Sequence, residues 1–315
     1  MNLNKLATQY VAFRRTFGER YQAGEEVLQS FCRVVGPDKQ VSQVRIKTVT
    51  AFLTGTGPIT ERWHKKYAVL KGFFRFAVSR GYLDKAPLPT EVPKHIPPRI
   101  PYVFTRAEIR RLLDAIPSLR HPCAQIEPPT LRAILLLLYG AGLRQGEALR
   151  LSITEVDLTH SLLTIHDSKF FKSRLIPISS HLTEVLRDYA RWRAATHPSA
   201  SADGHFFITR QGRAILKHTM EGTFKRLRKR ADLRCTDSSQ QQPRLHGLRH
   251  AFAVHRLVDW YRQEADVQRL VYHLSVYLGH SHLRHTQVYL TMIPDLLQQA
   301  GTLFERYARQ EDDHA

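Results

Sequence analysis

The chain has 315 residues, of which 43% are hydrophobic and 24% are charged. This composition is typical of globular proteins and excludes a disordered, collagen-like or low-complexity chain, and the length suffices for roughly two domains. Lys and Arg number 47 against 28 Asp and Glu, a formal net charge of +19. Such an excess predicts a polyanionic partner, nucleic acid foremost.

Three cysteines, Cys32, Cys123 and Cys235, lie far apart in the chain. They offer neither a disulfide framework nor a paired-cysteine metal motif, so we expect a reducing compartment. The longest apolar run, residues 133–143, is shorter than the ~20 residues that span a bilayer. The first residues lack the apolar core of a signal peptide. We therefore expect a soluble cytoplasmic protein that does not enter a membrane.

The first part of the chain carries apolar residues at helical spacing. The clearest stripe follows the spacing i, i+4, i+7 and i+11 and consists of Trp63, Tyr67, Leu70 and Phe74. Three earlier apolar clusters, in residues 3–13, 27–31 and 44–52, predict three more helices. We predict a compact helical domain over residues 1–84.

The last of these helices also carries positive charge beside its apolar stripe. The residues concerned are Lys65, Lys66, Arg75 and Arg80. They form either a DNA-facing surface or a solvated face, and the sequence favours neither.

Residues 85–101 predict an extended linker. Repeated prolines remove backbone donors and push each preceding residue out of the helical region. The segment is basic, with Lys85, Lys94, His95 and Arg99, which suits either a strap along a phosphate backbone or a solvated connection.

The remaining residues, 102–315, predict a second domain and a C-terminal tail. Thr105 and Glu108 have the spacing of a capping box, and residues 131–139 predict a buried helix. Residues 161–166 and 174–178 predict a β-hairpin around a lysine-containing turn, and from Leu182 onward the pattern is helical again. The predicted fold class is mainly α with a small antiparallel sheet (α+β).

Four short segments in this domain carry the residues of chemical interest. They are Gly142-Leu-Arg-Gln-Gly-Glu147, the hairpin turn with Lys169 and Lys172, Leu245-His-Gly-Leu-Arg-His-Ala-Phe-Ala-Val-His255, and Leu278-Gly-His with Tyr289 nine positions after His280. His246 and Arg249 are one helical turn apart and share a face.

In these segments and in their order, the sequence resembles the tyrosine recombinase (phage integrase) family. The first domain and the linker resemble the core-binding domain of that family. The resemblance implies that Arg144 and Arg249 bind phosphate, that Lys169 is the hairpin lysine and that His246 and His280 occupy the two histidine positions. It further implies that Tyr289 is the nucleophile and that Glu147 accompanies the first arginine. Gly247 departs from the family pattern, in which an acidic residue is common.

The chemistry of DNA cleavage favours the same assembly. A tyrosine can store the phosphodiester energy as a covalent phosphotyrosine, and two arginines can stabilise the charge of the five-coordinate phosphorus. A hairpin lysine can protonate the leaving 5′ oxygen, His246 can manage the Tyr289 proton and His280 can donate to the phosphate. We expect no cofactor and no metal.

Several assignments have alternatives. Lys172 competes with Lys169, and Tyr272, Tyr277 and Tyr307 compete with Tyr289, although only Tyr289 has the family spacing. A zinc cluster of His273, His280, His282 and His285 is disfavoured because no cysteine lies nearby. The apolar stripe of residues 293–307 packs either on a neighbouring protomer or on its own domain.

The sequence therefore predicts a site-specific recombinase. It would act through a 3′-phosphotyrosyl intermediate and a Holliday junction, as a tetramer on synapsed duplex DNA and a monomer in solution, associated with the bacterial nucleoid when bound. Whether accessory DNA-bending proteins take part stays open. The alternatives are a type IB topoisomerase-like enzyme and a DNA-organising protein that keeps the fold without catalysis.

Overall fold

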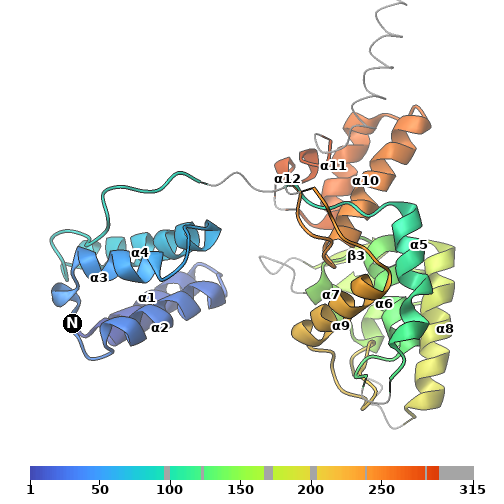
Figure 1. Ribbon diagram of the computed structural model, residues 1–315, viewed down its shortest axis with the longest axis horizontal. Coiled ribbons are helices and arrows are strands. Elements are labelled where there is room, and N and C mark those ends of the chain that lie inside the picture. Colours follow the sequence, from blue (N-terminus) through green and yellow to red (C-terminus); the bar gives the residue numbers. More distant parts are fainter. Residues whose placement is uncertain are drawn as a thin grey trace, which may run out of the picture. The chain divides into compact units, whose positions relative to one another are not determined.

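The computed structural model describes residues 1–95, 100–121, 124–166, 173–198, 204–237, 240–280 and 282–290. The chain divides into two compact units, residues 1–98 and 99–315. Figure 1 shows the elements of each unit. The division falls inside the Pro-rich segment.

The first unit contains the four helices that the apolar clusters predict. Their bounds are α1 (Leu3–Thr16), α2 (Gln22–Val35), α3 (Ile46–Thr54) and α4 (Glu61–Ser79), with a 3-10 turn η1 (Val41–Gln43) before α3. Helix α1 begins after Asn2, whose side-chain oxygen accepts hydrogen bonds from the N–H groups of Asn4 and Lys5. These bonds satisfy donors that have no partner within the helix.

Aromatic side chains form the core of this unit. On α4, Trp63, Leu70 and Phe74 are buried as the stripe predicts, and Tyr67 is half-buried and stacks on Trp63 with ring centroids 5.2 Å apart. Phe31 of α2 meets Phe74 edge to face at 6.0 Å. The predicted amphipathic helix is confirmed.

The second unit contains the remaining elements. They are α5 (Arg106–Asp114), η2 (Ile116–Leu119), α6 (Pro128–Gly140), α7 (Gln145–Arg150), η3 (Ile153–Glu155), β1 (Val156–Asp157), β2 (Leu162–Ile165), β3 (Arg174–Pro177), α8 (Ser180–Thr196), α9 (Lys217–Arg230), α10 (Gly247–Arg262), α11 (Val267–Leu278) and α12 (Arg284–Gln287). The predicted capping box starts α5, with Thr105 and Glu108 exchanging hydrogen bonds. The predicted fold class, mainly helical with a small antiparallel sheet, is confirmed.

The sheet has three antiparallel strands in the order β1-β2-β3. Strands β2 and β3 form the predicted hairpin, with Leu163 opposite Ile176, and both side chains are fully buried. Strand β1 was not predicted, because two residues are too few to show an alternating pattern.

Residues 204–216 are not helical, contrary to the expectation of an unbroken helical pattern after Leu182. They contain Phe206 and Phe207, both buried, and two isolated bridges that pair Ser152 with His205 and Ile208 with Ala214. The chain turns at Gly212, whose φ is +72°. Helix α8 therefore ends before this segment, and α9 begins after it.

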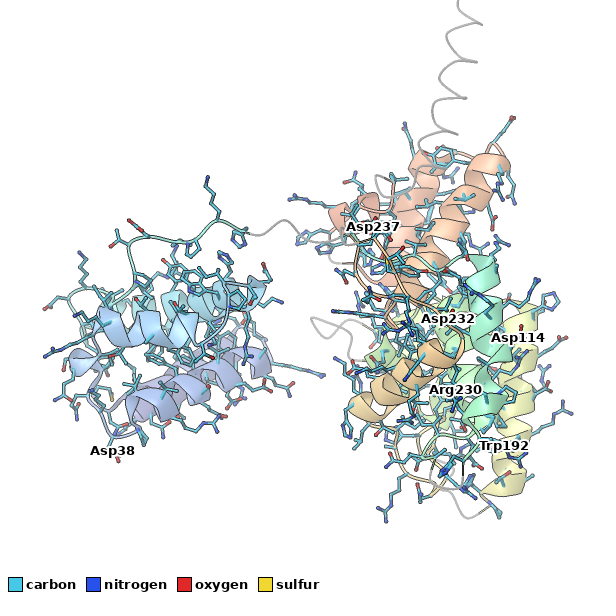
Figure 2. The ribbon with its side chains drawn as sticks, viewed as in Figure 1. Asp38, Asp114, Trp192, Arg230, Asp232 and Asp237 are labelled. Carbon is cyan, nitrogen blue, oxygen red and sulfur yellow. The ribbon has the colours of Figure 1, made fainter. Side chains whose placement is uncertain are left out.

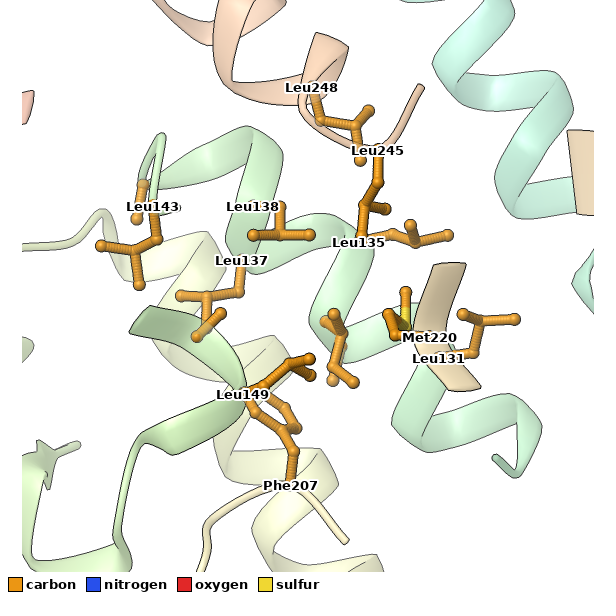
Figure 3. Packing of buried hydrophobic residues seen from close by; sticks show 14 of the residues in the cluster. Leu131, Leu135, Leu137, Leu138, Leu143, Leu149, Phe207, Met220, Leu245 and Leu248 are labelled. Carbon is orange, nitrogen blue, oxygen red and sulfur yellow. The ribbon is translucent and has the colours of Figure 1, made fainter. Parts of the chain in front are cut away.

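Helix α6 lies at the centre of the core and packs against α8 and α10. Four of its leucines, Leu131, Leu135, Leu137 and Leu138, are buried, whereas Leu136 is half-buried and Arg132 is exposed. Figure 3 shows them meeting Met220 of α9, Phe207, and Leu245 and Leu248 at the start of α10. A helix with such a wide apolar surface packs into the interior. It thus fixes the residues that follow it, 141–144.

The segment between α9 and α10 is tied to the start of the second unit. The backbone N–H of Gln241 donates to the Ile100 carbonyl at 2.9 Å, and Arg228 Nη1 donates to the Pro243 carbonyl at 2.6 Å. Asp232 and Asp237, labelled in Figure 2, mark the first part of this segment. These contacts fix the approach to His246.

No helix in the described ranges is long and apolar enough to cross a membrane.

Two glycines with positive φ allow a matched test of packing at the turn after α6. Gly142 has φ +59°, and a Cβ there would collide with the Phe252 ring and lie 3.0 Å from Leu278 Cδ2. Gly212 has φ +72° but open space around it. Gly212→Ala should destabilise the protein by ~1 kcal/mol through backbone strain alone. Gly142→Ala should cost about 1–3 kcal/mol more through overpacking.

The measurement is urea denaturation of the full chain and the two variants. Equal losses in the two variants would contradict the close packing around Gly142.

Candidate active site

The turn from α6 to α7 presents Arg144. The chain leaves α6 at Gly140, passes through the left-handed conformation at Gly142 and buries Leu143. Arg144 then stands at the N-cap of α7, where its backbone N–H donates to Glu147 Oε2 at 2.9 Å. Its guanidinium donates to Glu147 Oε1 at 2.8 Å and to the Gly279 carbonyl at 2.7 Å. The side chain remains a third exposed.

Glu147 is a buried carboxylate held by two arginines. Besides Arg144, Arg174 of β3 binds both of its oxygens, with distances of 3.1 Å and 2.9 Å. Burial acts to raise the pKa of the Glu147 carboxyl, but the hydrogen bonds and charges of Arg174 and Arg144 outweigh it and lower that pKa to about 2. The carboxylate therefore stays ionised and fixes the orientation of both arginines.

Arg249, on the first turn of α10, is 2% exposed. Its guanidinium donates to the Gly142 carbonyl and to the Leu278 carbonyl, both at 2.7 Å. Burial, followed by repulsion from Arg144, lowers its pKa to about 10, so it remains a cation at neutral pH.

Three arginines from different elements thus bind three consecutive carbonyls where α11 ends. Arg174 Nε donates to the Tyr277 carbonyl at 3.1 Å, Arg249 to Leu278 and Arg144 to Gly279. The last carbonyls of a helix lack intrahelical partners and carry the negative end of the helix dipole. The end of α11 therefore gathers positive charge at one place.

Gly279 lets the chain turn away immediately after these carbonyls. Its φ is +67°, and a Cβ there would lie 2.9 Å from the Arg174 guanidinium. The next residue, His280, hydrogen-bonds through Nδ1 to Thr286 Oγ1 of α12 at 2.7 Å. Burial, then the charge of Arg249, lowers the pKa of His280 to about 3, so its imidazole is neutral.

Tyr289 follows α12 and is 4% exposed. Its hydroxyl lies 3.0 Å from His250 Nδ1. Burial raises the pKa of this phenol, and the charge of the nearby Arg249 guanidinium acts in the opposite direction. Tyr289, Arg249, Arg144 and His280 are thus brought into one site.

His246 stands at the N-cap of α10 and lines a cleft of about 720 Å³ together with Arg144. The residue is partly open to solvent, yet desolvation of its ring in the cleft, then the charges of Arg249 and Arg144, lowers its pKa to about 4. Four further cations line the cleft: Lys217, Lys225, Arg228 and Arg244. Directly after His246, a Cβ on Gly247 would lie 2.9 Å from the Tyr102 carbonyl oxygen, so a larger residue does not fit there.

Sequence reasoning missed His250 and Arg174. His250 follows His246 by four positions, so the helical spacing that linked His246 to Arg249 already places it on the same side of α10. Arg174 lies within the predicted second strand, and no local pattern marks it as a partner of Glu147.

Three of the predicted residues, Lys169, Lys172 and Arg99, lie outside the described residues, as does the stripe of residues 293–307 with Tyr307.

The basic residues of the first unit are divided between surface and internal contacts. Lys65, Arg75, Arg80 and Lys94 are exposed. Lys66 instead donates to the Phe52 carbonyl at 2.7 Å and lies over the Phe52 ring. Burial lowers the pKa of Lys66.

The two described competitors of Tyr289 lie in other surroundings. Tyr272 is 62% exposed. The Tyr277 hydroxyl donates to the Pro177 carbonyl at 3.2 Å, and its ring stacks on Phe252.

The histidines near the end of α11 are close to one another but do not form a metal cluster within the described ranges. Ring centroids of His280 and His285 are 5.9 Å apart, and those of His282 and His285 are 5.7 Å apart. No group of three His, Cys, Asp or Glu side chains suited to hold a metal ion occurs among the residues the structure describes.

Residues 102–293 match the family model of the phage integrase family. The chain belongs to the phage integrase family. This confirms the family and the enzyme class that the sequence predicted.

Relatives match this phage integrase along most of its length. The putative integrase/recombinase y4rB of Sinorhizobium fredii is 33% identical over 312 residues, which covers 96% of this chain and 96% of the relative. Tyrosine recombinase XerA of Thermococcus onnurineus is 32% identical over 237 residues, covering 73% of this chain and 71% of the relative.

Solved structures share the fold. The integrase of transposon Tn1549 in complex with transposon right end DNA has a TM-score of 0.68 at 15% identity and covers 98% of this chain and 100% of its own. A lambda integrase dimer bound to a COC′ core site has a TM-score of 0.63 at 18% identity, covering 90% and 96%.

The buried Glu147 predicts a specific pH dependence of stability. Its pKa of about 2 in the folded protein is below the ordinary 4.5, so its contribution is present above about pH 4.5 and is lost as the pH falls toward 2. This contribution is on the order of 3 kcal/mol. Glu147→Gln should therefore be strongly destabilised at pH 7, and the gap to wild type should narrow between pH 5 and pH 2.

The measurement is urea denaturation across this pH range. Glu184→Gln is the control, because its carboxylate is exposed on α8 and should contribute less than about 1 kcal/mol. A gap between wild type and Glu147→Gln that does not change with pH would contradict the assigned role of the carboxylate.

Proposed function

We propose that this phage integrase is a site-specific DNA recombinase that cleaves and rejoins duplex DNA with Tyr289 as the nucleophile. One observation carries the proposal: the buried Tyr289 lies in the same charged site as Arg249, whose charge acts on the phenol, and its ring centroid is 6.3 Å from that of His280. Arg144 and His280 belong to the same site. A phosphate bound by Arg249 would thus lie next to the attacking oxygen.

Arg144 and Arg249 are the phosphate-binding pair. Each guanidinium has five N–H donors, and each uses donors on fixed carbonyls or on Glu147. The donors that remain can bind the nonbridging oxygens of a phosphodiester. Because the guanidinium groups are already oriented, they need no reorganisation as charge develops on phosphorus.

The proposed cleavage step exchanges one phosphoester for another. The Tyr289 oxygen forms a bond to phosphorus, the bond from phosphorus to the 5′ oxygen breaks, and the phenolic proton leaves to a base. The leaving 5′ oxygen takes a proton from the hairpin lysine, Lys169. His280 contributes a hydrogen bond to the phosphate, and rejoining reverses each transfer. The sequence predicts that His246 manages the Tyr289 proton, but His246 lines the cleft together with Arg144, and we assign it to the phosphate as well.

The proposed assembly is a tetramer on two synapsed DNA sites, formed from monomers in solution. Solved structures of the same fold include a lambda integrase tetramer bound to a Holliday junction and a dimer on a core site, which supports this proposal. We assign residues 1–84 to core binding, residues 85–101 to a basic linker and residues 102–315 to catalysis.

The proposed DNA surface includes the exposed cations Lys65, Arg75, Arg80 and Lys94, together with Lys66, Arg99 and Lys172. The cleft beside His246 adds Lys217, Lys225 and Arg244. Phosphate contacts of this kind make affinity fall steeply with salt.

Replacement of the nucleophile tests the proposal. Duplex DNA from the native locus, nicked just downstream of the candidate cleavage positions, should trap a covalent protein–DNA complex, because the short cleaved strand diffuses away. The complex should be absent in Tyr289→Phe, which has no attacking oxygen. Denaturing gels measure the complex. Tyr277→Phe is the matched control, since its hydroxyl binds the Pro177 carbonyl, and it should retain cleavage.

Tight DNA binding by wild type without any covalent complex would contradict the catalytic proposal and favour a DNA-organising protein.

A second measurement separates recombination from topoisomerase-like relaxation. Wild type should exchange strands between two DNA sites and yield recombinant products only when both sites are present. Relaxation of supercoiled DNA that carries no paired sites, at the same rate as DNA that carries them, would instead identify a topoisomerase-like enzyme.

A further inference from the structure

The proposed reaction requires a group that takes the phenolic proton of Tyr289, and the structure places His250 at that position. His250 Nδ1 lies 3.0 Å from the Tyr289 hydroxyl, within the range expected of a proton acceptor. The two ring centroids are 5.4 Å apart. This contact joins α10 to the segment after α12 across 39 residues of sequence.

The two histidines at the start of α10 face different parts of the site. His246 lines the cleft together with Arg144, whereas His250 contacts the tyrosine hydroxyl. Their rings meet edge to face with centroids 4.7 Å apart. His246 is thus placed for a bound phosphate, and His250 is placed for the nucleophile.

The electrostatic surroundings keep His250 in the form that can accept a proton. Burial, then repulsion from His246 and Arg249, lowers its pKa to about 3. The imidazole is neutral at physiological pH, and its unprotonated nitrogen can face the hydroxyl. Burial raises the pKa of Tyr289, so the phenol still carries its proton before the reaction and needs an acceptor.

We propose that His250 is a catalytic residue that accepts the Tyr289 proton as the phenolic oxygen attacks phosphorus. The proton moves from Tyr289 Oη to His250 Nδ1 while the new phosphoester bond forms and the bond to the 5′ oxygen breaks. On rejoining, the imidazolium returns the proton to the tyrosine. This inference rests on the proposed function, in which Tyr289 is the nucleophile.

The substrate itself favours this transfer. A phosphate bound by Arg144 and Arg249 adds negative charge near His250, which offsets the repulsion by Arg249. The same negative charge stabilises the imidazolium as it forms.

Helix α10 supplies a matched control. Five residues after His250, His255 Nδ1 lies 2.9 Å from the Tyr139 hydroxyl. The two histidines therefore make the same kind of half-buried contact from one helix, and only one of them contacts the proposed nucleophile. Asn can keep a hydrogen bond at the Nδ1 position of either histidine, but it cannot accept a proton at neutral pH.

The test measures the rate of covalent complex formation on the nicked duplex in wild type, His250→Asn, His255→Asn and Tyr289→Phe. His250→Asn should be slowed about 100-fold or more, with unchanged DNA affinity and thermal stability close to that of His255→Asn. His255→Asn should cleave at nearly the wild-type rate. A His250→Asn rate within threefold of wild type, or above it, would overturn the proposal.

The pH dependence separates proton transfer from simple positioning. The charged and titratable groups around His250 are His246 and Arg249 from its own helix and Tyr289 from the segment after α12. Without His250, hydroxide must remove the phenolic proton, so the His250→Asn rate should rise about tenfold per pH unit between pH 6 and pH 9. The wild-type profile should be flatter, and parallel profiles would overturn the proposal.

A substrate with sulfur in place of the leaving 5′ oxygen provides the last comparison. A thiolate leaves without a proton donor, so this substrate should restore cleavage in Lys169→Ala but not in His250→Asn. Restored cleavage in both variants would mean that His250 assists departure of the 5′ oxygen, and it would overturn the proposal. Tyr289→Phe tests the proposed function separately from the role of His250. If that variant still forms the covalent complex, Tyr289 is not the nucleophile and the proposed function is wrong, whatever the cleavage rate of His250→Asn.

Discussion

The binding of three arginine side chains to the carbonyl end of α11 is the interaction on which the rest of the site depends. Arg174, Arg249 and Arg144 come from β3, α10 and the turn before α7, and they bind the carbonyls of residues 277, 278 and 279 in turn. Three cations this close repel one another, and after burial this repulsion is a further cause of the lowered pKa of Arg249. The helix dipole and the Glu147 carboxylate offset that repulsion.

The same arrangement explains why several elements must fold before the site exists. Glu147 binds arginines from two elements, and Arg249 also binds the Gly142 carbonyl. That carbonyl belongs to a turn whose conformation only glycine adopts easily and whose space is filled by Phe252 and Leu278. The buried helix α6, which ends at this turn, thus connects the hydrophobic core to the charged groups. The arginines are oriented by packing as much as by their own hydrogen bonds.

The sequence predicted the parts of this structure that have a local signal. The stripe on α4, the capping box at Thr105 and the hairpin all appear where periodicity and turn chemistry placed them. Strand β1 was not predicted because two residues are too few to show an alternating hydrophobic pattern. The non-helical structure of residues 204–216 was not predicted because buried aromatic residues are compatible with both a helix and a loop. Arg174 contacts Glu147 across 27 positions, and His250 contacts Tyr289 across 39 positions. Local sequence spacing cannot predict contacts between residues so far apart in the chain.

Tyr289 and the arginines are held in the protein by different kinds of contact. Each arginine is fixed to backbone carbonyls or to a buried carboxylate, whereas the described segment after Gly279 is joined to its surroundings by side-chain contacts such as His280 with Thr286 and Tyr289 with His250. A side-chain hydrogen bond contributes only about 1 kcal/mol net, and Gly279 supplies a turn at the base of the segment. Tyr289 is also 4% exposed and packs in an apolar cluster with Phe252 and Leu278, so burial as well as the His250 contact holds its ring. The end of α11 thus separates the arginines, which bind its carbonyls, from the segment that carries Tyr289.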